Sequence, residues 1–270
     1  MTGWIVAHGD AIRLAVFLGM LAAMLAWELA SPLRRAEVPR LFRWANNLAL
    51  VVVDGIAVRL VFPLAAVGAA LWAEARGTGL LRALDLHPAL AIAAAILLLD
   101  LAIWAQHRVF HAVPLLWRLH RVHHADLDVD ASTGLRFHPF EILLSMAIKI
   151  AVVVALGAPA VAVLLFEVIL NATSIFNHAN IRLSPAADRV LRLFVVTPDM
   201  HRVHHSWLPE ETNSNFGFNL PWWDRLFGTY RPAPRDGQTG MTVGLRRFRA
   251  PVESRLDRML VQPFRADGAP

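Results

Sequence analysis

Residues 88–111 read PALAIAAAILLLDLAIWAQHRVFH, an almost unbroken apolar run that ends in two histidines. The run from Pro88 to Gln106 is long enough to cross the hydrocarbon core of a bilayer as a helix, which takes about 20 residues. Its opening proline suits a first helical turn. His107 and His111 then stand four residues apart, one turn along the same helix face. This stretch predicts a membrane-spanning helix that carries metal-binding side chains at one end.

Two apolar stretches nearer the N-terminus predict further spans. Residues 11–30 have about the length of one crossing. Residues 48–72 form another span, which Pro63 should kink because proline removes a helical hydrogen bond. Asp54 and Arg59 lie inside this second stretch, and ionisable side chains at membrane depth are expected to face protein or the interface.

The last long apolar stretch, residues 142–176, is interrupted by Gly157-Ala158-Pro159. Its halves of about 15 and 17 residues are marginal for a full crossing, so two tilted spans and a re-entrant hairpin both fit. Either arrangement returns the chain to the side that it left. The expected fold class is all-α, a polytopic membrane helical bundle with a histidine-rich cap that holds two metals.

Three regions follow from this division of the chain. Residues 1–106 contain the N-terminal spans, and residues 107–232 contain the histidines together with the hairpin at about 142–176. Residues 233–270 form a basic tail, in which Pro251–Leu260 has the apolar spacing of an amphipathic helix.

The composition supports a membrane protein and excludes several functions. Apolar residues make up 56% of the chain and charged residues 17%, whereas soluble domains have about 45–50% and about 25%. There is no cysteine, which excludes disulfides, thiolate metal sites, iron–sulfur clusters and covalently attached haem within this chain. The net charge of +5 is carried by arginine, with Lys149 as the one lysine. No solvated basic face with interleaved aromatic residues indicates nucleic-acid binding.

The distribution of arginine predicts the orientation, because cytoplasmic loops are enriched in basic residues. The loop after the first span is basic, the loop at 74–85 is not, and the third span then returns the chain to the cytoplasm at His107. We therefore expect a multi-pass protein, in a bacterial inner membrane, with its active site on the cytoplasmic side. The arginines that set this orientation are Arg34, Arg35, Arg40 and Arg43.

Ten of the twelve histidines lie between positions 107 and 205, in three short clusters with two single residues between them. The pattern His-x-x-His-His occurs twice, and neighbouring imidazoles would repel if they were charged. A metal resolves this, since neutral imidazole is the commonest metal-binding side chain. So many ligands exceed what one ion accepts, which predicts two ions. The candidate ligands are His107, His111, His120, His123, His124, His138, His178, His201, His204 and His205.

These motifs, on a polytopic membrane chain, resemble the fatty acid hydroxylase superfamily, which includes sterol desaturase and alkylglycerol monooxygenase relatives. The resemblance covers about residues 95–232, although tyrosine is more usual than Trp104 at the entry to the first cluster. It implies two Fe ions and O2 as co-substrate, used to hydroxylate, desaturate or cleave a lipid. Beyond the histidine clusters it is carried by Asp100-x3-Trp104-x2-His107-Arg108, Arg136-Phe137-His138-Pro139, Phe176-Asn177-His178, Asn215-Phe216-Gly217 and the run from Trp223 to Tyr230.

Two aspartates are candidates for orienting the ligands rather than binding metal. Asp100 lies two helical turns before His107 on the same face, where its carboxylate could accept a ligand N–H. A simple polar contact inside the membrane is the other interpretation. Asp224 could likewise orient a ligand histidine, or it could instead serve a turn or a salt bridge with Arg225.

Two other functional classes fit part of this pattern. A zinc-dependent membrane hydrolase would use a metal-bound hydroxide, although nine or ten imidazoles are more than that chemistry requires. A metal transporter would place its ligands at mid-membrane depth, whereas these histidines cluster at helix ends and in loops on one side.

An oxygenase also needs electrons that this chain has no means to supply. It contains no Gly-x-Gly-x-x-Gly nucleotide motif and no cysteine for an iron–sulfur cluster. We therefore expect, besides the lipid substrate and membrane lipids, an external electron donor: a ferredoxin, a cytochrome or a reductase.

Overall fold

The computed structural model describes residues 2–266, and in this range it is all-helical, with two isolated β-bridges and no strand. Five helical segments are long and apolar enough to cross a membrane. The predicted all-α membrane bundle is thus confirmed. The five segments are α2 (Gly9–Ala30), the stretch Arg40–Ala83, α6 (Pro88–Ala112), α8 (Pro139–Leu156) and α9 (Ala160–His178).

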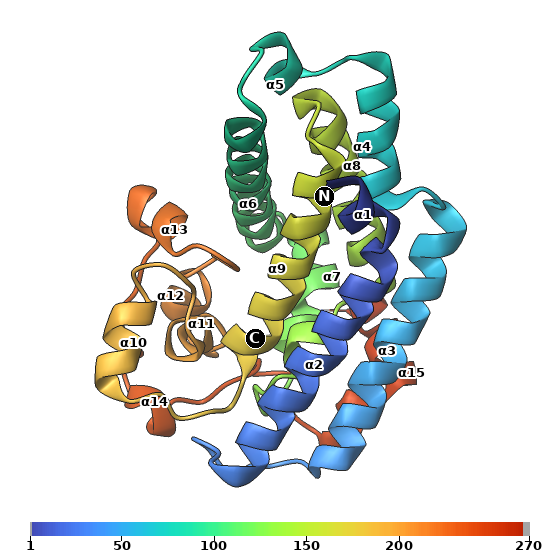
Figure 1. Ribbon diagram of the computed structural model, residues 1–270. Helices are drawn as coiled ribbons and strands as arrows, with labels where there is room; N and C mark the ends of the chain where they lie inside the picture. The colour runs from blue at the N-terminus through green and yellow to red at the C-terminus, as the bar shows by residue number, and fades with distance from the viewer. Residues whose placement is uncertain (1, 267–270) are drawn as a thin grey trace.

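The second segment is more strongly interrupted than the expected kink. It consists of α3 (Arg40–Val61), α4 (Ala65–Arg76) and the single turn α5 (Leu80–Ala83). Helix α3 stops just before Pro63, because that residue has no N–H to continue the helical ladder. Figure 1 shows α4 continuing upward beyond the end of α3, displaced to one side.

The apolar stretch at 142–176 forms two helices that are both long enough to cross. Helices α8 and α9 contain 18 and 19 residues, so each extends for about 27–29 Å. Gly157 ends α8 in the left-handed conformation (φ +61°). A Cβ on Gly79 would lie 2.1 Å from the backbone nitrogen of Gly157. This close approach of two backbones requires glycine at both positions.

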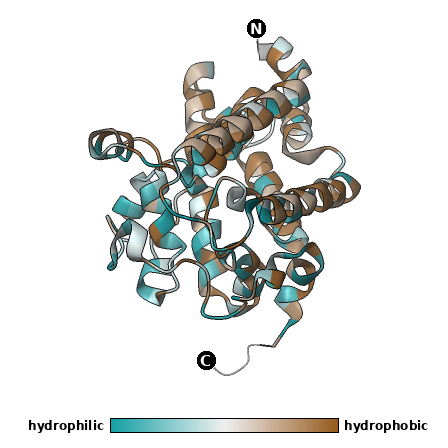
Figure 2. Ribbon diagram, turned by 90° about the horizontal axis from the view of Figure 1, so that it is seen from below, coloured by the Kyte–Doolittle hydropathy of each residue, from teal (hydrophilic) through white to brown (hydrophobic). Residues whose placement is uncertain are grey.

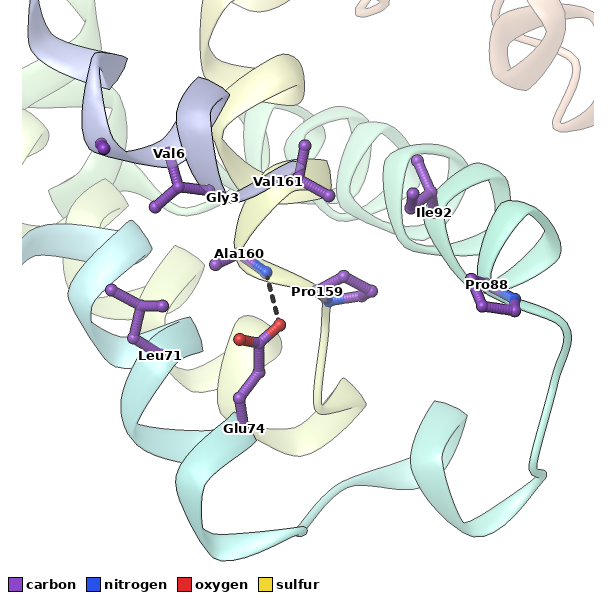
Figure 3. Close-up of a pocket in the computed structure, with 10 residues that line it drawn as sticks. Gly3, Val6, Leu71, Glu74, Pro88, Ile92, Pro159, Ala160 and Val161 are labelled. Atoms are coloured by element: carbon purple, nitrogen blue, oxygen red, sulfur yellow. Dashed lines mark hydrogen bonds between the residues drawn. The ribbon is translucent and has the colours of Figure 1, made fainter. Parts of the chain in front are cut away.

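An acid on α4 closes the turn between α8 and α9 at the same end of the bundle. The carboxylate of Glu74 accepts a hydrogen bond of 3.0 Å from the backbone N–H of Ala160, at the start of α9 (Figure 3). An apolar cavity of about 540 Å³ lies beside it, lined by Val6, Leu71 and Ile92 among others. This end of the bundle is opposite the histidines.

The other end of the bundle is covered by short helices, which together we call the cap. They are α7 (Pro114–His124), α10 (Pro185–Leu191), α11 (Pro198–His204), α12 (Pro209–Thr212), α13 (Trp222–Leu226), α14 (Gly237–Gly240) and α15 (Leu256–Val261). Viewed from below, hydrophilic residues concentrate in the cap, whereas the long helices are mostly hydrophobic (Figure 2). Four of these helices begin with proline at their first turn, a position that proline favours.

The arginine-rich loop after α2 lies against the cap, as the predicted orientation requires. Leu33 donates its N–H to the carbonyl of Asn180 at 3.0 Å. The Arg34 guanidinium donates to the carbonyls of Gln238 and Met241, both at 2.8 Å. The basic loop and the segments that follow the third and fifth spans therefore share one end of the bundle.

A buried cluster of charges fixes α3 to the segment that follows α7. The Arg43 guanidinium donates to both carboxylate oxygens of Asp126 at 2.7 Å and to Asp130 at 2.6 Å. Arg43 and Asp126 are fully buried. The carboxylate of Glu28, in α2, accepts the backbone N–H groups of Ala131, in this same segment, and of Asn180, just after α9, both at 2.8 Å.

The basic tail folds back onto the bundle. The expected helix at Pro251–Leu260 forms instead as a 3₁₀ turn, Pro251–Ser254, followed by α15. The interruption lies at Arg255, whose backbone is extended. Met259 of α15 is fully buried against Leu50 and Val122, so its apolar face packs on protein.

Candidate metal centre

The structure brings nine of the ten candidate histidines together in two adjoining groups. In each group, the candidate ligand atoms lie within 4.8 Å of one another. The first group draws on α6, α7 and α11, and the second on α7, the end of α9 and α11. The groups are His107, His111, His120, His124 and His204, and His123, His178, His201 and His205.

The spacing of the imidazole nitrogens fits a bound metal ion. The Nε2 atoms of His107 and His120 are 3.0 Å apart, and Nε2 of His178 lies 3.1 Å from that of His123 and 3.0 Å from that of His201. Two nitrogens bound at right angles to one ion, with metal–nitrogen bonds of about 2.1 Å, would be about 3.0 Å apart. Two imidazoles that hydrogen-bond directly to each other would show the same distances. Buried nitrogens that have no hydrogen-bond partner are therefore stronger evidence for a bound metal.

Several buried imidazole nitrogens have no hydrogen-bond partner among residues 2–266. They include Nε2 of His124 and of His204, and both nitrogens of His111 and of His205. Buried polar atoms are nearly always paired, and a metal ion is the partner that unprotonated imidazole nitrogens accept. The donor set therefore fits two metal ions, one in each group.

Hydrogen bonds at the opposite ring nitrogen orient four of these imidazoles. Nδ1 of His107, of His178 and of His204 lies 2.7–2.8 Å from the carbonyl oxygens of Phe216, Ser174 and Ser214, respectively. Nδ1 of His120 lies 2.6 Å from a carboxylate oxygen of Glu141. Since carbonyls and carboxylates only accept, Nδ1 carries the proton and Nε2 is left free to bind metal.

The surroundings keep the cap histidines in their neutral, metal-binding form. Burial lowers the pKa of His120 to about 3. For the remaining cap histidines, burial first and then repulsion between neighbouring imidazoles lower the pKa well below its ordinary value; these are His123, His124, His201, His204 and His205.

His138 does not join either group, in contrast to the prediction. Its Nδ1 accepts the backbone N–H of Phe140 at the start of α8, and its Nε2 donates to the carbonyl of Leu260 at 3.1 Å. Both nitrogens are thus used to cap a helix and to hold the tail. We therefore leave His138 out of the ligand set, and the structural role considered for a residue before Pro139 fits it better.

Neither candidate aspartate accepts a hydrogen bond from a ligand histidine, so both roles need correction. Asp100 accepts the indole N–H of Trp223 at 2.8 Å, which fastens α13 to α6. Asp224 accepts the N–H groups of Phe216 and Gly217 at 2.9 and 2.8 Å and the indole N–H of Trp104 at 2.9 Å. Asp224 thereby holds the loop whose Phe216 carbonyl orients His107, one step further from the metal than expected.

Glu141 is the residue at this site that the sequence analysis missed. It is buried at the start of α8, beside His120. The signal that could have found it is an acid inside an apolar helix, which is costly in a membrane and marks function by default.

A second cavity connects the first histidine group with the interior of the bundle. It has a volume of about 600 Å³ and is lined by residues of α2, α3, α6, α7, α8 and α9. His107 and His120 form part of its wall, next to Phe110 and Phe137. Such a volume is in the range of ligand-binding pockets, and this cavity, unlike the one in Figure 3, reaches the candidate metal centre.

The fold and the site define a class, namely membrane helical bundles with two histidine groups that could hold metal in a cap at one end. Residues 92–229 match the model of the fatty acid hydroxylase family. The match covers half of the chain and includes all nine clustered histidines, and the chain belongs to this family. The predicted resemblance is thereby confirmed.

Named relatives are similar over about half of this chain. An ornithine lipid hydroxylase from Rhizobium tropici is 31% identical over 53% of this chain and 43% of its own length. The alkylglycerol monooxygenase of Homo sapiens is 29% identical over 53% of this chain and 31% of its own. Cholesterol 25-hydroxylase of Rattus norvegicus is 28% identical, over 52% and 46% respectively. The chain thus matches less than half the length of these relatives. No solved structure matches.

Proposed function

We propose that this protein is a membrane-bound, di-iron, O2-dependent lipid hydroxylase or desaturase. The observation that carries the proposal is the arrangement of nine histidines in two groups, with a cavity from the membrane-embedded bundle reaching the first group. Three relatives are named for the oxidation of an ornithine lipid, an alkylglycerol and cholesterol. Two bound irons would supply the redox chemistry that activates dioxygen.

The residues of this chain would then hold the metals, shape the substrate site and limit access of water. Imidazoles in both groups supply neutral ligands, and Glu141 and the Phe216 carbonyl orient two of them. The aromatic rings of Phe110, Phe137 and Phe218 line the cavity beside His107. An apolar wall of this kind favours a lipid chain over water.

The reaction requires an external electron donor. Hydroxylation places one atom of dioxygen into a C–H bond and reduces the other to water, which consumes two electrons and two protons. We propose that a ferredoxin, cytochrome or reductase supplies the electrons at the cap. By the positive-inside rule, the basic loop that lies against the cap would place this face in the cytoplasm, in a bacterial inner membrane.

Metal analysis of protein purified without oxygen tests the proposal. We expect two irons per chain, and we expect His123→Ala and His204→Ala to lose metal and activity. Either variant with full metal content and full turnover would contradict the assignment of its group. Two zinc ions together with lipid hydrolysis that needs no oxygen would favour the hydrolase instead.

The turnover assay supplies purified protein with lipid and oxygen, with and without a reducing partner. We expect product in the presence of the reductant, with one product oxygen derived from labelled O2 if the reaction is a hydroxylation. Sustained turnover without any electron donor would rule out the oxygenase.

A further inference from the structure

The cavity beside the first histidine group contains buried acceptors that the protein itself does not satisfy. Among the residues of its wall that the structure describes, three side-chain oxygens are buried without a hydrogen-bond partner: Oδ1 of Asp54, Oε1 of Gln106 and Oε2 of Glu141. No buried side-chain donor in this described part of the wall lacks a partner. A matching ligand must therefore bring donors rather than acceptors.

Asp54 is the most demanding of the three groups because it is an acid that is buried with no hydrogen-bond partner at Oδ1. Its side chain projects from α3, 7% of the residue is exposed, and it interacts electrostatically with Glu141, a second acid. Burying a carboxylate without a partner costs several kcal/mol. A buried acid that is retained in a membrane protein is therefore expected to bind a ligand.

Two of the three cations that line this wall are paired with an acid other than Asp54. Arg13 and Lys149 both bind Glu167, at 2.5 and 3.2 Å. The third cation, Arg59, is exposed, and among residues 2–266 no cation forms a salt bridge with Asp54. A hydroxyl can donate one hydrogen bond to this acid, whereas an ammonium group can donate several and also stabilises the ionised carboxylate.

We propose that the cavity binds an amphiphile with a protonated amine, and that Asp54 receives the ammonium group. This inference rests on the proposed function, since it names the class of lipid that the site would oxidise. Glu141 binds His120 through its other oxygen, so an amine between Asp54 and Glu141 lies close to the metal centre. The alkyl chain then extends along Ile103, Met146 and Leu170.

The binding test uses metal-loaded protein in non-ionic detergent and two probes of equal chain length, dodecylamine and dodecanol. Equilibrium dialysis at pH 7 measures the affinity of each. We expect the amine to bind at least about tenfold more tightly than the alcohol, and Asp54→Asn to remove that preference, because a buried charge pair is lost. Asp85→Asn, which makes the same charge change at an exposed position, should behave like the wild type.

Thermal unfolding without probe checks that the Asp54→Asn variant is still folded. Asp54→Asn should unfold at the same temperature as the wild type or higher, since it removes a buried acid whose Oδ1 has no hydrogen-bond partner. Equal binding of both probes to the wild type, or an amine preference that survives in Asp54→Asn, overturns the inference.

Lipid oxidation separates this inference from the proposed function. If the holoenzyme oxidises lipids but shows no amine preference, the inference fails while the proposed function stands. If the amine preference depends on Asp54 but no lipid is oxidised with oxygen and a reductant, the binding site stands and the proposed function fails.

Discussion

Glu141 accepts a hydrogen bond from Nδ1 of His120 at 2.6 Å, with both side chains buried at the junction of α7 and α8. This contact holds the imidazole with Nε2 turned toward the first histidine group, and it joins the candidate metal centre to the wall of the second cavity. Partners of this kind raise ligand basicity and fix ring orientation, and removing them weakens metal binding.

Substitution of Glu141 should therefore lower metal affinity without unfolding the protein. We expect Glu141→Ala to lose about 10–100-fold in affinity, measured by competition with a chelator while circular dichroism monitors helix content. Glu210→Ala removes an exposed acid of the cap and should change nothing. Unaltered affinity in Glu141→Ala would mean that the contact does not support the metal.

His138 and His123 should respond differently to replacement by alanine. His138→Ala should retain both metals and lose about 0.5–2 kcal/mol of stability, because it removes a helix cap. His123→Ala should lose metal from the second group. Metal content per chain and the thermal midpoint distinguish the two effects. A loss of metal in His138→Ala equal to that in His123→Ala would return His138 to the ligand set.

Asp224 should influence one metal more than the other. Its carboxylate holds the loop at Phe216 and Gly217, and the Phe216 carbonyl binds His107 of the first group. We expect Asp224→Asn to lower the metal content from two toward one ion per chain. Asp236→Asn, at an exposed position in the same cap, is the matched control. Equal loss from both groups would indicate general unfolding of the cap instead.

Local patterns in the sequence were sufficient to predict the spans and the clustered histidines. The apolar run at 88–106 and the i, i+3, i+4 spacing of the imidazoles specify a helix and one of its faces whatever the rest of the chain does. For that reason α6 continues through His107 and His111 as expected.

The outcomes that the sequence did not predict depend on contacts between distant segments. His138 and His178 both stand alone in the sequence. Their roles differ because His138 binds the carbonyl of Leu260, whereas His178 lies beside His201. Asp100 lies on the expected helix face, but Trp223, 123 residues away, takes its carboxylate. The pairing of Arg43 with Asp126 likewise spans 83 residues, which no local periodicity reveals.

This last pair makes a prediction about stability and pH. Burial alone would raise the pKa of Asp126, but the guanidinium groups of Arg43 and Arg136 hold it well below its ordinary value. A carboxyl group whose pKa is depressed by folding contributes stability above its unfolded pKa of about 3.9, and loses that contribution as the pH falls further. Acidification below about pH 4 should therefore weaken the wild-type cap.

Arg43→Met removes the cation and leaves Asp126 and Asp130 buried without their main partner. We expect a loss of about 3–5 kcal/mol at neutral pH, seen as a lower thermal midpoint in detergent. Without Arg43, only Arg136 still opposes the effect of burial at Asp126, so the variant should lose less stability on acidification than the wild type. Arg35→Met, at an exposed position in the loop that precedes α3, should keep the wild-type pH dependence. Because the histidines titrate in all three proteins, the difference between variants isolates the effect of the carboxyl group. Parallel pH profiles for Arg43→Met and the wild type would show that this pair does not control the acid response.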